Sequence, residues 1–127
     1  MWRGRYVTLV LLCAGLVHLL PLTGVLGAPR LAALYGVAID DAGLLALMRH
    51  RAVLFGVLGA FMLHAAWSPP LQAWALGAAL ASTAGFICIA ASVTPLSPAL
   101  RSVMWVDIVL AALLLVAFGL RLTARRS

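Results

Sequence analysis

Four long apolar segments make up most of the chain, and they limit its fold more than any other feature. Each has about the 20 residues that an α-helix needs to cross a lipid bilayer, and 65% of the 127 residues are hydrophobic. We expect helices because the bilayer core offers no hydrogen-bonding partner to an open backbone. The sequence therefore predicts an all-α integral membrane protein, a single four-helix bundle over residues 1–127 with spans at about 6–27, 44–67, 71–92 and 102–122.

Helix-breaking residues mark the connections between these segments. The sequence SPP follows the second span at residues 68–70, and VTPLSPALR separates the third span from the fourth. The connection between the first two spans is longer, and Pro29 near its start and Gly36 as a stop signal predict a short interfacial helix. We expect Asp40 or Asp41 to cap the second span, because a carboxylate suits the positive end of a helix.

The first segment has two interpretations. Val25 and Gly27 form a small-residue pattern before Ala28 of the kind that a signal peptidase cleaves. However, the apolar stretch is longer than the core of a typical signal peptide, and it contains His18 and Pro21. We therefore expect this segment to be retained as the first span.

The arginines predict the orientation of the chain, since all nine basic residues are arginine. Five of them flank the two termini: Arg3, Arg5, Arg121, Arg125 and Arg126. Arg30 and Arg101 lie on the side opposite the termini. Arg49 and Arg51 also count on that side if their side chains reach its surface. The positive-inside rule then places both termini in the cytoplasm. The net charge is +6, but the arginines form no dense basic patch, so nucleic acid is not an expected partner.

Three ionisable side chains inside the spans are expected to share one layer. At a rise of 1.5 Å per residue, His18, Arg49 and Asp107 all lie roughly 8 to 12 Å below the outer surface. Arg49 falls on the helical face that carries the small residues of the second span, which predicts that it faces the bundle. Arg51 falls among larger apolar residues, and we expect it to reach outward to the interface.

The resulting candidate site is a polar cluster of His18, Arg49, His50 and Asp107. A guanidinium at this depth needs a partner, and Asp107 is the only acid within a predicted span, so we expect an Arg49–Asp107 ion pair. Two interpretations stay open: the pair locks two helices in register, or the cluster lines a polar pocket that opens to the periplasmic leaflet. No residue is assigned a catalytic role. No cofactor or metal is predicted, because haem ligation by two lone histidines is a weak signal.

In layout the whole chain resembles a group of short bacterial membrane proteins of unknown function that are related to the DoxX-like four-helix proteins. The specific motifs are LYG at residues 34–36, the aspartate before the second span, and Arg49-His50-Arg51. Members of that group are often labelled phosphopantetheine adenylyltransferases, a label that the sequence does not support. That enzyme family has a soluble α/β nucleotide-binding fold with an H-x-G-H motif, whereas this chain has three widely spaced histidines and no lysine.

These observations suggest three functions for a protein of the bacterial inner membrane. The first is an accessory or assembly component without its own catalysis. The alternative is a protein or membrane enzyme that binds a lipid or a quinone-type molecule, with Arg49 and His50 holding its headgroup, His18 available for proton transfer and Asp107 orienting the arginine. The third is a small homodimeric transporter. Membrane lipids are the expected partners, with a quinone, other membrane proteins or a second copy of the chain as further candidates.

Overall fold

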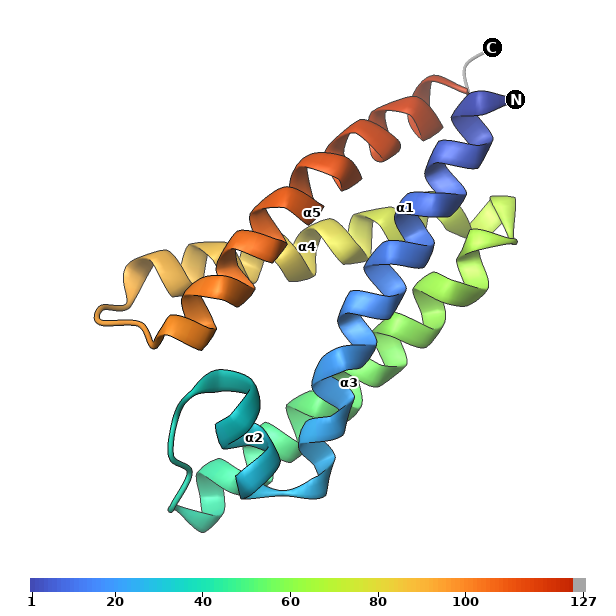
Figure 1. Ribbon diagram of the computed structural model, residues 1–127. Coiled ribbons are helices and arrows are strands. Elements are labelled where there is room, and N and C mark those ends of the chain that lie inside the picture. The colour runs from blue at the N-terminus through green and yellow to red at the C-terminus, as the bar shows by residue number, and fades with distance from the viewer. Residues whose placement is uncertain (125–127) are drawn as a thin grey trace.

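The computed structural model describes residues 1–124, and these are helical along most of their length (Figure 1). The elements are, in order, α1 (Trp2–Leu19), the 3-10 helix η1 (Leu20–Leu26), α2 (Ala28–Tyr35), α3 (Ala42–Ala66), α4 (Pro69–Ser92) and α5 (Pro98–Thr123). Among the described residues, four segments are long and apolar enough to cross a membrane: α1 with η1, α3, α4 and α5. The predicted all-α membrane bundle is confirmed. Arg125 and Arg126, which entered the predicted orientation, lie outside the described residues.

Local signals account for the ends of these helices. Asp41 caps α3, since its Oδ1 accepts a hydrogen bond from the backbone N–H of Leu44 at 2.7 Å. Gly36 ends α2 in the left-handed conformation, with φ of 64°, which glycine adopts without the steric penalty of a side chain. Near Pro21 the first span changes from α-helix to 3-10 helix, because proline lacks the N–H that would continue the α-helical pattern. The short helix expected between the first two spans is α2.

The four long helices pack in a ring in which α3 and α5 are diagonal. Neighbouring pairs are α1 with α3, α3 with α4, α4 with α5, and α5 with α1. The α1–α3 contact is close: a Cβ added at Gly59 would lie 2.8 Å from the carbonyl oxygen of Gly15. Small residues at such a crossing let two backbones approach. Fully buried side chains, among them Leu11, Met62 and Leu114, fill the centre of the ring.

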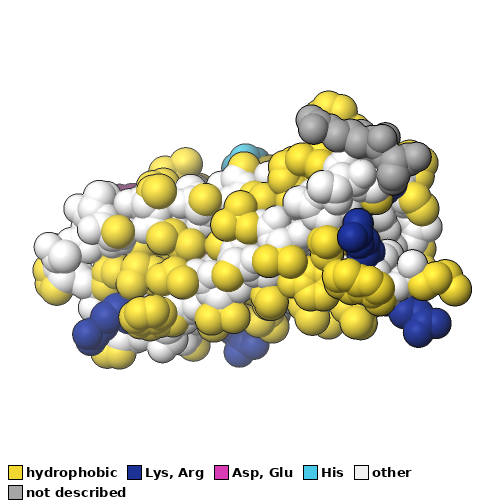
Figure 2. Space-filling view, turned by 90° about the horizontal axis from the view of Figure 1, so that it is seen from above, with side chains coloured by type: hydrophobic (Ala, Val, Ile, Leu, Met, Phe, Trp, Pro, Cys, Tyr) yellow, Lys and Arg dark blue, Asp and Glu magenta, His cyan; other side chains and the backbone are white. Residues whose placement is uncertain are grey.

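The two ends of the bundle differ. Both termini lie at one end, and α2 lies at the other, where it packs against η1 and the start of α5 (Figure 1). On the face shown in Figure 2, hydrophobic side chains predominate and the basic side chains stand apart from one another. The tryptophans are all exposed: Trp2, Trp67, Trp74 and Trp105. We call the two regions the α2 end and the terminal end.

Candidate functional site

A cavity of about 230 Å³ lies within the bundle toward the α2 end. Every helix from α1 to α5 contributes to its wall, through His18, Tyr35, Arg51, Phe86 and Asp107 in that order. Apart from His18, Tyr35, Arg51, Asp107 and Ser102, the wall is apolar. Two of the four residues predicted for the site, His18 and Asp107, are thus brought to one cavity.

Arg51 supplies the positive charge of this cavity. Its Nη1 donates a hydrogen bond to the hydroxyl oxygen of Tyr35 at 2.8 Å. Its Cζ lies 4.5 Å from the ring centroid of Phe55 and 5.4 Å from that of Tyr35. Aromatic faces attract a guanidinium, and more strongly where water is excluded. The charge is therefore held by one hydroxyl and two rings, and most of its N–H donors remain available to another molecule.

The short helix α2 sets the position of Tyr35. Tyr35 is the last residue of α2 and is 6% exposed. Its backbone carbonyl accepts a hydrogen bond from the Ser97 hydroxyl, and the same hydroxyl oxygen accepts the backbone N–H of Leu100 at 3.1 Å to cap α5. The left-handed Gly36 allows this close approach, since a Cβ there would lie 3.3 Å from Ser97 Oγ. One serine thus fastens the end of α2 to the start of α5 and fixes the tyrosine beside Arg51.

His18 forms a fixed part of the wall and is 2% exposed. Its Nδ1 lies 2.8 Å from the carbonyl oxygen of Ala14, and since a carbonyl only accepts, Nδ1 carries the hydrogen. In the neutral ring, Nε2 then accepts a hydrogen bond from the hydroxyl of Ser82 at 3.0 Å. The ring also stacks on Phe55, with centroids 5.4 Å apart. Both ring nitrogens therefore form hydrogen bonds within the protein. His18 positions Phe55 by stacking, and it contributes the face of its ring to the cavity wall.

Asp107 is the acidic group of the cavity. It is partly buried on α5, and within residues 1–124 it forms no hydrogen bond or ion pair. Asp107 and Arg51 come from diagonal helices and border the same open space, but they are not joined.

The predicted Arg49–Asp107 ion pair is absent, and this prediction is corrected. Arg49 is exposed, and its Nε donates a hydrogen bond to the carbonyl oxygen of Val25 in η1 at 2.8 Å. His50 is also exposed and lies outside the cavity wall. The reason is the arrangement of the helices: Arg49 faces the first span, whereas Asp107 lies on α5 across the diagonal of the ring.

The predicted direction of Arg51 is also wrong. Of the large apolar residues that share its face, Met62 is 0% exposed and Phe55 is partly buried, whereas Leu54 is exposed. The small residues of α3 mark a different face, which packs on the first span through Gly56 and Gly59. In this bundle the small residues of α3 therefore mark the close crossing with α1 and η1, and Arg51, Phe55 and Met62 lie on a side of α3 that faces the interior.

Sequence analysis also missed Tyr35, although it is part of the LYG motif. Together Tyr35, Arg51 and Asp107 place hydrogen-bond donors and an acceptor around a mainly apolar space, an arrangement typical of sites for small organic molecules. The described residues hold no group of three or more His, Cys, Asp or Glu side chains that could bind a metal ion. The free donors of Arg51 suit the polar oxygen atoms of an organic group, and the Asp107 carboxylate suits a hydroxyl.

Comparisons of the chain with protein-family models, with curated proteins and with solved structures find no match.

Proposed function

We propose that this integral membrane protein binds a small lipid-soluble molecule of the quinone type, with its polar head in the cavity of Arg51, Tyr35 and Asp107. One observation carries the proposal: Arg51 and Asp107 border an open cavity of about 230 Å³ without forming an ion pair. We place both termini in the cytoplasm and the protein in a bacterial inner membrane, and we propose a relationship to the DoxX-like four-helix proteins.

The open cavity favours binding over a purely structural role for the two charges. A structural lock needs the two groups in direct contact, because attraction offsets the cost of burying charge only at short range and with good hydrogen bonds. Here Arg51 is bonded to Tyr35, and Asp107 has no partner among residues 1–124. A hydroquinone head placed between them would accept from the guanidinium and donate to the carboxylate, whereas the oxidised quinone would accept from the guanidinium alone.

A second cavity supports a ligand that has an apolar extension. It measures about 310 Å³ and shares Tyr35, Arg51 and Phe86 with the first cavity. The rest of its wall is apolar and includes Leu44, Met48 and Ile89. A ring with carbonyl or hydroxyl oxygens would fill the first cavity, and an isoprenoid or acyl chain would continue through the second into lipid.

The cavity is suited to binding, and none of its residues is assigned a reaction. The residue expected to transfer protons, His18, uses both ring nitrogens in hydrogen bonds to Ala14 and Ser82. A bound quinone would therefore be held by the protein for another membrane component, which agrees with an accessory role.

The test compares Arg51→Gln with Arg49→Gln in full-length protein purified into phosphatidylcholine nanodiscs. Both variants lose one positive charge on the same helix, two residues apart. The affinity for a short-chain ubiquinone and a short-chain menaquinone, each in its oxidised and its reduced form, is measured, and helix content is checked by circular dichroism. We expect Arg51→Gln to weaken binding about tenfold or more, because hydrogen bonds from a charged donor are lost. Arg49→Gln should bind as the unaltered protein does.

The alternatives predict different results. Equal binding by both variants would contradict the proposal, as would the absence of quinone binding by the unaltered protein. An accessory component without a ligand would bind neither quinone yet would still co-purify with a membrane partner. A homodimeric transporter would move a solute across proteoliposomes, with activity that depends on dimer formation.

A further inference from the structure

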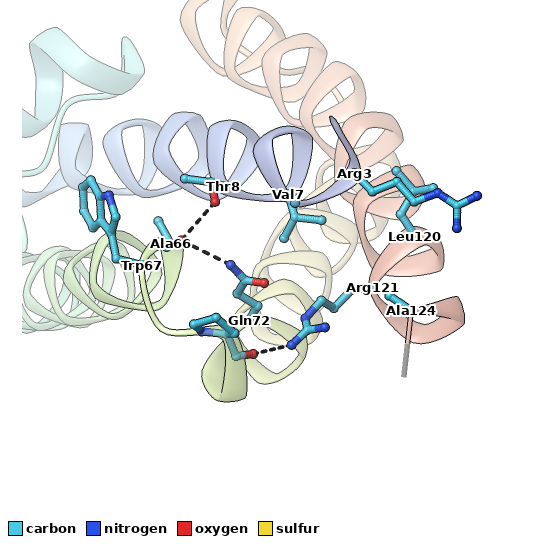
Figure 3. A pocket seen from close by; sticks show the side chains of 11 residues that line it. Arg3, Val7, Thr8, Ala66, Trp67, Gln72, Leu120, Arg121 and Ala124 are labelled. Atoms are coloured by element: carbon cyan, nitrogen blue, oxygen red, sulfur yellow. Dashed lines mark hydrogen bonds between the residues drawn. The ribbon is translucent and has the colours of Figure 1, made fainter. Parts of the chain in front are cut away.

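The terminal end of the bundle contains a separate cavity of about 420 Å³. It lies between the start of α1, the α3–α4 connection and the end of α5 (Figure 3). Arg3 and Arg121 are its charged lining residues, and Trp67 lies at its edge with 70% of its surface exposed. An exposed tryptophan at the end of a span is typical of the level of the lipid headgroups.

Arg121 is the charged group that reaches into this cavity. Figure 3 shows its guanidinium directed from α5 toward the start of α4, where Nη2 donates a hydrogen bond to the carbonyl oxygen of Pro69 at 2.7 Å. Its Nε is buried and has no hydrogen-bond partner. A buried donor without an acceptor is costly and uncommon. The guanidinium of Arg121 is therefore held in place by Pro69, and at least one of its N–H donors has no acceptor.

The other polar groups of the cavity do not supply the missing acceptor. The side chains of Thr8 and Gln72 both donate to the carbonyl oxygen of Ala66, at 3.1 and 3.2 Å (Figure 3). The arginines also lack a side-chain carboxylate, because the three acids of the chain are Asp40 and Asp41 before α3 and Asp107 at the α2 end. Positive charge in this cavity is therefore not balanced by any acidic side chain of the protein.

Phosphate is the chemical group that fits these features. Its oxygens only accept hydrogen bonds when ionised, and arginine binds them through paired N–H groups. Basic pockets between spanning helices at the headgroup level are suited to anionic lipids. Arg3 lies at the rim and is exposed, with its guanidinium 5.7 Å from the centroid of the Trp2 ring. A rotation of this long side chain would bring it toward a phosphate held by Arg121.

We propose that the cavity of Arg121 and Arg3 binds a phosphate group at the membrane surface, carried by an anionic phospholipid or by free phosphate. This site is independent of the quinone-type site at the α2 end, since the two cavities share no lining residue.

The test measures phosphate binding by full-length Arg121→Gln and by a matched control, Arg30→Gln. Arg30 is an exposed residue of α2 at the opposite end of the bundle, so both variants carry the same net charge. In one arm, native mass spectrometry counts phosphatidylglycerol retained from nanodiscs that contain equal amounts of phosphatidylglycerol and phosphatidylcholine. In the other, thermal unfolding in neutral detergent is followed as inorganic phosphate is added, with chloride at equal ionic strength as the reference.

We expect the unaltered protein and Arg30→Gln to retain phosphatidylglycerol, and Arg121→Gln to lose it by about tenfold, as the loss of a charged hydrogen-bond donor predicts. A lipid effect alone identifies a phospholipid as the source, and protection by inorganic phosphate that requires Arg121 identifies free phosphate. Since Arg121→Gln also loses its bond to Pro69, Arg121→Lys is measured beside it and should keep part of the binding. Equal lipid retention and equal phosphate response in Arg121→Gln and Arg30→Gln would overturn the proposal.

Discussion

The two ends of this bundle each hold an arginine in a cavity, but they balance its charge differently. At the α2 end, Arg51 bonds to the Tyr35 hydroxyl, lies against two aromatic rings and faces the acid Asp107 across open space. At the terminal end, Arg121 bonds to a backbone carbonyl and meets no acidic side chain. The same side chain therefore suits two classes of ligand. A cavity with both charges favours a neutral head that donates and accepts, whereas a cavity with arginine alone favours an anion.

We expect the largest effect from a substitution that disturbs the α1–α3 crossing, because both cavities depend on this crossing. Gly59→Val places a side chain where a Cβ already meets the Gly15 carbonyl oxygen at 2.8 Å. Overpacking of this kind costs roughly 1 to 3 kcal/mol, so we expect a lower unfolding temperature and loss of both quinone and phosphatidylglycerol binding. The matched control is Gly77→Val, because a Cβ at Gly77 meets nothing within 4 Å. If Gly59→Val were as stable as Gly77→Val, the close crossing would not support both cavities.

A second substitution should make the α2 end resemble the terminal end. Asp107→Asn removes the acid that faces Arg51, so the cavity should accept anions that it previously repelled. In an Arg121→Gln background, which removes the other proposed anion site, we expect the affinity for decanoate to rise about tenfold, because a like charge close to the ligand is lost. Asp40→Asn is the control, since it removes one exposed acid outside the cavity. No difference between the two variants would show that Asp107 does not select the ligand.

The sequence predicts the helices better than the site, for a physical reason. Proline, glycine and aspartate act locally, so Gly36 and Asp41 fall where the helix ends were expected. The depth of a residue along its span also follows from the local sequence. The predicted depths placed His18 and Asp107 in one layer, and both residues line one cavity. Rotation about the helix axis is different: α3 is apolar on all sides, so its pattern does not distinguish lipid from the interior. Arg49 and Arg51 were assigned opposite directions on that weak signal, whereas the structure places Arg49 against η1 and Arg51 in the cavity.

The terminal cavity was missed for a related reason. Arg121 near the end of a span fits an interface anchor, and its bond to Pro69 depends on a contact between residues 52 positions apart. In the same way, the link from Tyr35 to Ser97 joins residues 62 positions apart. Such contacts follow from how the helices meet, and the spacing of residues along the chain does not encode them.

A smaller effect tests which feature holds Arg51 in the α2-end cavity. Tyr35→Phe removes the hydroxyl that accepts from Arg51 at 2.8 Å and keeps the ring beside the guanidinium. One hydrogen bond to a charged group is lost, so we expect quinone affinity to fall about fivefold while phosphatidylglycerol binding is unchanged. Tyr6→Phe serves as the control, because its hydroxyl bonds to the Leu113 carbonyl outside both cavities. Equal quinone affinities for the two variants would show that the aromatic rings hold Arg51 in place without the Tyr35 hydroxyl.

We expect the smallest effect from removing the cap of α3, which tests whether the stability of the α2 end can change without a change in its ligand affinity. Asp41 caps α3 through the Leu44 N–H at 2.7 Å, and removing such a cap costs about 1 kcal/mol. Asp41→Ala should therefore lower the unfolding temperature by a few degrees, as measured by circular dichroism in detergent, with ligand affinity at both ends kept. Asp40→Ala removes the neighbouring exposed acid, for which the structure records no hydrogen bond within residues 1–124, and should leave the unfolding temperature unchanged. A loss of quinone affinity in Asp41→Ala, with no change in Asp40→Ala, would mean that the start of α3 supports the cavity. The two ends of the bundle would then differ in helix stability as well as in charge.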